Sequence, residues 1–221
     1  MILDIHEIIM QNPIKILRRI SSKYAPSRNL SFGIVHIFKT LQLASVHGHI
    51  SRSFLCKELS IGEGSVKTLV KHLKMNDMII TSKSGTILTN KGKVILRDLL
   101  TLIPSETIIP KSSITLGKFN YCVLLKNSAR LIGSGLEQRD EAIKLGATGA
   151  TTLIFSNGKF LIPETEYDAL DREDIIRDLL IQKLKPKDND VIIIGSDDNT
   201  KITAELATKG AALFTMMTLD H

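Results

Sequence analysis

Cysteine is scarce in this chain of 221 residues, which contains only Cys56 and Cys122. Two cysteines give no disulfide framework, so the sequence favours a reducing cytoplasmic compartment. No apolar run approaches the ~18 residues that a membrane span needs, and the opening stretch does not have the basic-then-apolar order of a signal peptide. Internal repeats and low-complexity tracts are also missing. We therefore expect a cytoplasmic protein with no membrane partner.

Metal-binding spacings are absent as well. His47, His49, Cys56 and His72 occur in one stretch, but no C-x-x-C or H-x-x-x-H spacing relates them. His36 has apolar neighbours along the chain, where a packed histidine is commoner than a metal ligand. We predict no metal site, the sequence names no cofactor, and no nucleophile–base pair suggests an enzyme.

The composition itself is that of a globular protein. Hydrophobic residues make up 43% of the chain and charged residues 24%, which excludes disorder as the main description. The charge is uneven: residues 1–103 hold 15 Lys and Arg against six Asp and Glu, a net charge of +9, whereas residues 104–221 hold 14 against 17, a net charge of −3. A basic half joined to a slightly acidic half suggests that only the first meets a polyanion.

Prolines mark the expected boundaries. Pro104 and Pro110 enclose a short polar segment, and proline restricts the residue before it and removes a hydrogen-bond donor. The predicted fold class is an α+β winged helix-turn-helix domain followed by a small α/β domain. The predicted parts are a helical arm at 1–29, the winged helix at 30–104, a linker at 105–111 and the α/β domain at 112–221.

Residues 2–22 have apolar side chains at roughly helical spacing, interrupted at Pro13, and a basic cluster at Lys15, Arg18, Arg19 and Lys23. This pattern fits an arm along phosphates, a helix that pairs with a second subunit, or simply a solvated helix face. The sequence leaves the three alternatives open.

The clearest pattern lies in residues 30–103. A helix with one apolar face ends at Gly48, a second follows Ser51 as its N-cap, and a glycine turn leads to a third. Two β-rich runs around 83–85 then predict a hairpin, and a last helix follows. Helix, helix, turn, helix, hairpin and helix is the order of a winged helix-turn-helix.

The third helix has the features of a DNA-recognition helix. If Val66, Leu69, Val70 and Leu73 point inward, the outward side chains are short, polar or cationic, as the major groove requires. The hairpin offers further groups for the backbone or the minor groove. The predicted DNA-binding residues are Arg52, Ser65, Lys67, Thr68, Lys71, His72, Lys74, Lys83, Ser84 and Thr86. Docking of protein or RNA is the alternative, because winged helices serve those roles too.

The second half alternates between strand and helix patterns. The pair Asn157-Gly158 predicts a hairpin, and Asp171 is the expected cap of a helix that follows it. A buried strand at 190–196, a helix at 200–211 and a strand at 212–217 predict a parallel βαβ unit. The other predicted elements are a strand at 114–126 and a helix at 134–147.

Two loops of this half are candidates for a small polar effector. One follows the buried strand, where α/β sheets commonly bind ligands, although a turn with Asp or Asn caps is the plainer interpretation. The other is a Gly/Thr turn after a helix, and a helix C-cap followed by a tight turn explains its glycines equally well. The candidate ligand residues are Arg139, Asp140, Thr148, Thr151, Thr152, Gly195, Ser196, Asp197, Asp198 and Asn199. The sequence does not tell whether the two loops share one edge of the sheet.

Three stretches carry a resemblance to a known family: APSRNLSFGIVHIFKTLQL, SRSFLCKELSIGEGSVKTLVKHLK and EQRDEAIKLGATGATTLIFSNGKFLIP. They resemble archaeal two-part proteins, most of all thaumarchaeal ones, that join a winged helix to a C-terminal domain of unknown function. The resemblance spans nearly the whole chain and implies a transcriptional regulator. It supplies no ligand or catalytic residue.

These observations lead to one main function hypothesis and two others. The first is a regulator that binds double-stranded DNA as a homodimer and whose acidic half binds a small polar effector or forms the dimer contact. A regulator whose second half serves only for assembly is the second. A small α/β transferase or hydrolase that uses Asp140, Asp197 or Asp198 is the third.

Overall fold

The computed structural model describes residues 12–22 and 30–217. The chain divides into two compact units, residues 1–99 and residues 100–221, which we describe separately. No helix in the described ranges is long and apolar enough to cross a membrane.

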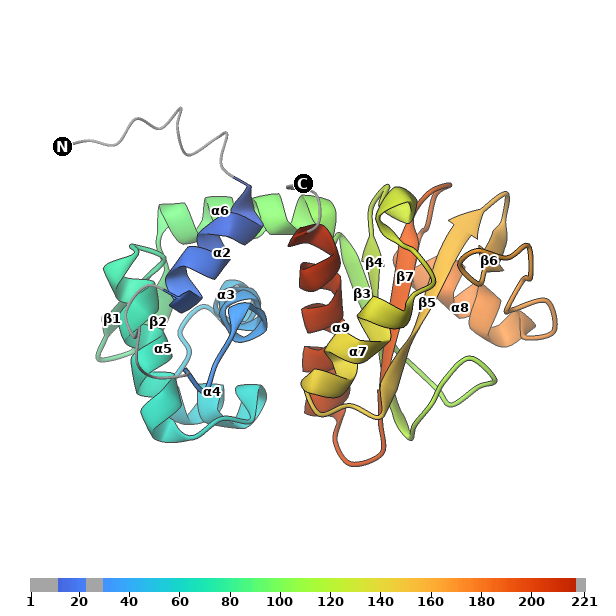
Figure 1. Ribbon diagram of the computed structural model, residues 1–221. Helices are drawn as coiled ribbons and strands as arrows, with labels where there is room; N and C mark the ends of the chain where they lie inside the picture. The colour runs from blue at the N-terminus through green and yellow to red at the C-terminus, as the bar shows by residue number, and fades with distance from the viewer. Residues whose placement is uncertain (1–11, 23–29, 218–221) are drawn as a thin grey trace. The chain divides into compact units, whose positions relative to one another are not determined.

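Unit 1 is mainly helical and carries one two-stranded hairpin (Figure 1). The three predicted helices of residues 30–76, the hairpin around 83–85 and the following helix are all confirmed. Its elements are α2 (Pro13–Ser22), α3 (Ile34–His47), α4 (Arg52–Leu59), α5 (Glu63–Met75), β1 (Ile79–Ser82), β2 (Gly85–Leu88) and α6 (Asn90–Leu102), the last of which extends past residue 99.

The local signals that end and begin these helices act as expected. Gly48 adopts a positive φ of 68° after α3, a conformation that glycine adopts without strain. The Ser51 hydroxyl accepts the Phe54 N–H at 3.1 Å and so caps α4. Val66, Leu69 and Leu73 of α5 are fully buried, as the apolar stripe predicts.

The basic N-terminal segment packs inside unit 1. Pro13 is the first residue of α2 rather than a break within a helix, because the missing N–H of proline costs nothing in the first turn. Ile14, Leu17 and Ile20 are buried, and α2 contacts α3 and α5. Residues 2–11 of the predicted helical pattern, together with Lys23 and the end of the predicted arm, lie outside the described residues.

Unit 2 is built on a five-stranded sheet with the strand order β3-β4-β7-β5-β6. Every neighbouring pair is antiparallel, and the hairpin at Asn157-Gly158 is confirmed. Its elements are β3 (Ser105–Ile109), β4 (Phe119–Leu125), a short 3-10 turn η1 (Ala129–Leu131), α7 (Leu136–Lys144), β5 (Gly149–Ser156), β6 (Lys159–Leu161), α8 (Asp174–Leu184), β7 (Val191–Asp197) and α9 (Lys201–Met217).

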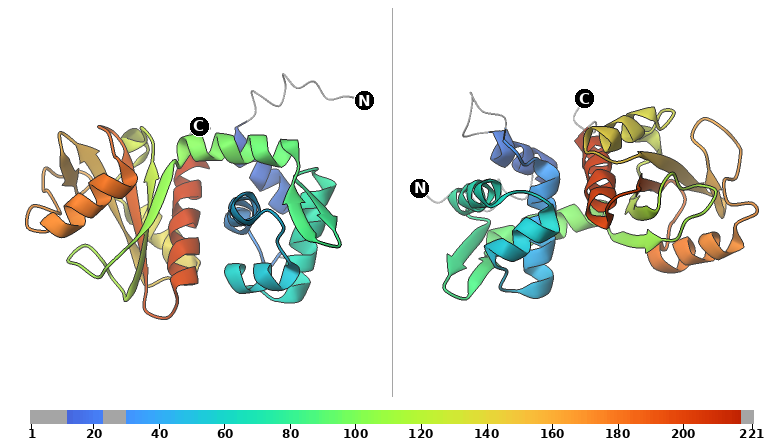
Figure 2. Two further views of the ribbon diagram at one scale, coloured as in Figure 1. Left: turned by 180° about the vertical axis from the view of Figure 1, so that it is seen from behind. Right: turned by 90° about the horizontal axis from the view of Figure 1, so that it is seen from below.

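Helices cover both faces of this sheet. α9 contacts β4 and β7, and α7 contacts β5 and α9, whereas α8 contacts β3. Both views of Figure 2 show α7 and α9 on one face and α8 on the other. The core beneath α8 includes Leu124, Leu153 and Ile192, and β7 is buried at every position because it lies in the middle of the sheet. Unit 2 is therefore α+β with an antiparallel sheet.

Three sequence predictions for unit 2 are wrong. Residues 212–217 continue α9 instead of forming a strand, so the parallel βαβ unit does not exist. The predicted linker 105–111 contains β3, which pairs with β4 through register partners such as Ile109 and Asn120. Glu173, not Asp171, is the residue before the first turn of α8. Each error has the same origin, since a short apolar or polar run does not reveal its tertiary partner.

Candidate nucleic-acid interface

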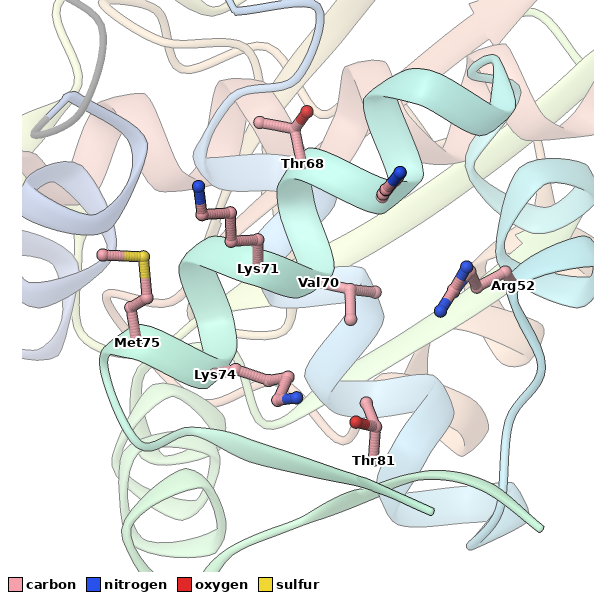
Figure 3. Close-up of a pocket in the computed structure, with 8 residues that line it drawn as sticks. Arg52, Thr68, Val70, Lys71, Lys74, Met75 and Thr81 are labelled. Atoms are coloured by element: carbon pink, nitrogen blue, oxygen red, sulfur yellow. The ribbon is translucent and has the colours of Figure 1, made fainter. Parts of the chain in front are cut away.

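A groove of about 480 Å³ lies along the outer face of α5 (Figure 3). Four of its lining side chains are cations and none is a carboxylate. Figure 3 shows Arg52 extending toward α5 from the start of α4 and Thr81 facing α5 from β1. The lining residues are Arg52, Lys67, Thr68, Val70, Lys71, Lys74, Met75 and Thr81.

Helical spacing explains how α5 supplies three of the four cations. Lys67, Lys71 and Lys74 are separated by four and three positions, so they follow one another along one face of the helix. All three are exposed, and the opposite face is anchored in the core by the buried stripe. Thr68 lies among them, and its hydroxyl donates to the Gly64 carbonyl at 3.0 Å. The groove therefore presents positive charge on a rigid element.

Arg52 owes its position to the cap of α4. It is the first helical residue after Ser51, whose hydroxyl holds the turn through the Phe54 N–H. Five of the residues predicted to bind DNA line this groove, namely Arg52, Lys67, Thr68, Lys71 and Lys74. Ser65 is half-buried and does not line it.

His72 does not belong to the outward face, and its prediction as a DNA-binding residue fails on burial. Its side chain is only 4% exposed, and its Nδ1–H donates to the Ile20 carbonyl of α2 at 3.0 Å. Phe32 packs edge-on against the ring, with 5.5 Å between ring centres. His72 therefore joins α5 to α2, a neighbour that the pattern of α5 alone does not indicate.

Three residues of the hairpin are predicted to contact DNA, and two of them are exposed. Lys83 and Ser84 are exposed at the tip between β1 and β2, where the Ser84 hydroxyl lies 3.1 Å from His49 Nδ1. Thr86 is 4% exposed, and its backbone exchanges two hydrogen bonds with Ile50. Thr86 therefore belongs to the base of the hairpin, and its predicted contact with DNA is wrong.

Sequence reasoning missed Val70, Met75 and Thr81, which also line the groove. Val70 was assigned to the buried stripe and is mostly buried, yet one side of it borders the groove. Thr81 comes from β1, the strand that follows α5 and contacts it. The exposed positions of β1 (Thr81 among them) were the available signal.

The two candidate effector loops lie at the same end of the unit 2 sheet. Gly149 at the start of β5 is the register partner of Ser196 near the end of β7, and the Thr148 N–H donates to the Ser196 carbonyl at 2.9 Å. They meet because the strands are antiparallel, so the rule for ligand sites in parallel sheets does not apply here.

Most polar groups of these loops already have partners within the chain. Asp197 is 2% exposed, and its Oδ2 accepts the N–H groups of Asn199 and Thr200 at 3.0 and 2.7 Å. Asp198 Oδ1 accepts the Lys118 N–H. These contacts form a capped turn that leads from β7 into α9. A turn with Asp or Asn caps was the alternative to a ligand-binding loop in the sequence analysis.

The remaining candidate residues are dispersed or similarly engaged. The Ser196 hydroxyl accepts the Leu116 N–H, the Gly195 N–H donates to the Thr208 hydroxyl, and Thr151 donates to the Ile114 carbonyl. Arg139 and Asp140 form an ion pair of 2.9 Å on the exposed side of α7. Thr152 is buried, and its hydroxyl has no partner in the described part of the chain.

Metal ligands do not gather in the described ranges: no group of three or more His, Cys, Asp or Glu side chains is placed to hold an ion.

Comparison with known proteins gives family matches for both units. Residues 36–94 match the model described as "PH0730-like, N-terminal domain", and residues 116–217 match "Domain of unknown function (DUF4443)". No curated protein matches the sequence. Among solved structures, the chain is similar to hypothetical protein PH0730 from Pyrococcus horikoshii OT3, with a TM-score of 0.70 and 24% identity over 85% of this chain and 95% of that one. The chain thus combines a part similar to the PH0730-like N-terminal domain with a part similar to a domain of unknown function, in the fold of an archaeal hypothetical protein.

Proposed function

We propose that the chain is a transcriptional regulator that binds double-stranded DNA through unit 1. The observation that carries the proposal is the groove along α5, where Arg52, Lys67, Lys71 and Lys74 converge without a carboxylate among the lining residues. Polyanions are the natural ligands of such a surface, because each neutralised phosphate releases a condensed counterion.

The order of elements favours DNA among the polyanions. α3, α4, α5, the β1–β2 hairpin and α6 follow one another as in a winged helix-turn-helix, whose third helix enters a major groove about 12 Å wide. In this proposal Lys67 and Lys71 contact bases or adjacent phosphates, and Lys83 and Ser84 of the hairpin contact the backbone beside them. The A-form major groove of duplex RNA is too narrow for the same approach.

We also propose that the protein acts as a homodimer and not as an enzyme. One α5 helix covers one half-site, and two-fold related half-sites one helical turn apart are the usual targets of such modules. Of the three carboxylates in the alternative enzyme hypothesis, Asp197 and Asp198 accept backbone N–H groups, and Asp140 pairs with Arg139. Unit 2 then serves for assembly or for binding an effector.

The test measures binding to labelled duplexes selected from genomic DNA at a series of salt concentrations. The readout is the fluorescence anisotropy of the labelled duplex. Lys67→Gln and Lys71→Gln should each weaken binding, and the slope of log K against log salt should fall by about 0.9 for each phosphate that the variant no longer neutralises. Lys93→Gln is the matched control, since Lys93 is an exposed lysine on α6 outside the groove.

Unchanged affinity and slope in both groove variants and in their double variant would refute the assignment of α5. Equal competition by duplex RNA would favour RNA docking instead. Sedimentation of the protein with a palindromic duplex gives the number of protomers per site, and a single protomer would refute the dimer.

A further inference from the structure

A second cavity, of about 210 Å³, lies entirely within unit 2. It is formed between the end of β3, the start of β4 and the first turn of α9. Its walls combine apolar side chains with Asn120 and two lysines, and the residues that matter most here are Ile108, Lys118, Phe119, Tyr121, Lys201 and Ala204. This volume is below the roughly 300 Å³ at which pockets for drug-sized ligands begin, so its ligand is small.

The floor of the cavity is apolar. Ile108 and Tyr121 are register partners on β3 and β4, and Ala204 faces them from α9. Ile108 is 57% exposed although it is a large aliphatic side chain. The Tyr121 ring is held in place because the Lys209 ammonium lies 5.4 Å from its centre. An apolar body of a ligand would cover these carbon surfaces.

Two cations border this floor. The Lys118 ammonium lies 5.2 Å from the centre of the Phe119 ring, which keeps it beside the cavity. Lys201 begins α9, where the helix dipole adds partial positive charge. Neither ammonium forms an ion pair within the described residues.

The neighbouring carboxylates are already engaged. Glu106 on β3 and Glu205 on α9 both pair with Lys209, at 3.1 and 2.6 Å, and Asp198 accepts the Lys118 backbone N–H at 3.0 Å. The lining side chains include no carboxylate. The two lysines therefore place positive charge at the mouth, whereas the cluster of Glu106, Lys209 and Glu205 beside Tyr121 holds one carboxylate more than it holds ammonium groups.

From this arrangement we propose that the cavity binds a small organic carboxylate with an apolar body. A monoanion of this kind satisfies two separated lysines and covers the floor with its apolar body, whereas a free phosphate would leave the apolar surface bare. In the proposed regulator, this carboxylate would be the effector. Binding of the carboxylate does not depend on that role; only its effect on DNA binding rests on the proposed function.

The experiment is a titration of the full-length protein with sodium benzoate, in which binding is measured from the amide chemical shifts. Benzoate should shift the amides of residues 118–121 and 201–204 in a saturable way, and the neutral isostere benzamide and inorganic phosphate should bind at least threefold more weakly. Lys118→Gln and Lys201→Gln should each weaken benzoate binding about threefold to fivefold, as expected for exposed ion pairs. Lys183→Gln, an exposed lysine on α8, should leave it unchanged.

Ile108→Glu provides a test that does not disturb the core, because Ile108 is exposed on the edge strand β3. It should abolish benzoate binding by placing a carboxylate at the mouth, while Ile108→Gln should retain binding within about threefold. Absence of saturable shifts, shifts confined to other residues, or equal binding of benzamide or phosphate would overturn the proposal. The measurement contains no DNA, so its failure is distinct from failure of the α5 assignment.

Discussion

Acidification should destabilise unit 1 through His36. This residue lies in the first turn of α3, and its Nδ1 accepts the Gly33 N–H at 3.1 Å. Burial, together with the nearby charge of Lys39, lowers its pKa from 6.5 to about 4. The neutral ring is therefore the form that the folded state holds, since a protonated Nδ1 would lose the capping bond.

The sign and size of the effect follow from this difference. Below pH 6.5 the unfolded chain binds a proton that the folded chain refuses until about pH 4, so stability falls as the pH falls through this window. At about 1.36 kcal/mol for each pKa unit, the loss in the free energy of unfolding is about 2 kcal/mol at pH 5 and about 3 kcal/mol at pH 4.

Hydrogen exchange of the slowest α3 amides measures this loss in unit 1 alone. His36→Gln is the control, because its side-chain oxygen can accept the Gly33 N–H without titrating. Wild type and variant are compared at each pH, so that the intrinsic exchange rates cancel. The protection of the wild type should fall more steeply between pH 6.5 and 4. Parallel pH profiles would refute the view that His36 is held neutral.

Four further predictions concern stability, measured by urea unfolding of the full chain. Gly92→Ala should destabilise the protein by about 2 kcal/mol or more, because the added Cβ would meet the Met78 carbonyl oxygen. Gly64→Ala, with open space around it, should instead stabilise by up to about 1 kcal/mol, and a loss there would contradict the packing. Ser51→Ala should cost about 1 kcal/mol by removing the cap of α4, whereas an unchanged midpoint would show that the cap contributes nothing. Asp197→Ala should cost about 2 kcal/mol, since two backbone N–H groups lose a charged acceptor; a loss below about 0.5 kcal/mol would contradict that role.

The local pattern of the sequence was sufficient for most of unit 1. The period of 3.6 residues in α3 and α5, the cap at Ser51 and the turn at Gly48 are written in neighbouring residues, and they also place the lysines of α5 on one face. His72 shows where this reasoning fails. Its burial depends on α2, more than 50 positions earlier in the chain, so no window around α5 contains the information.

The same limit explains the errors in unit 2. The apolar run at 212–217 fits a buried strand or a buried helix equally, and the helix wins because Ala211 and Ala212 continue α9 against β4 and β7. The direction of β7 depends on which strands flank it, and both partners are distant in sequence. The two candidate loops were chosen from their composition, which does not reveal the backbone N–H groups that Asp197 and Asp198 already accept.

The central position of β7 has a consequence for synthesis of the chain. β4 ends at residue 125 and β5 at residue 156, yet the strand that lies between them begins only at residue 191. Contacts in unit 1 are mostly local, so we expect that unit to form early, while β4 and β5 wait for a partner that emerges late. A chain that stops before residue 191 would keep two apolar strand edges unpaired, and such edges are templates for aggregation. Nascent unit 2 is therefore the part of this protein with the greatest need for a chaperone.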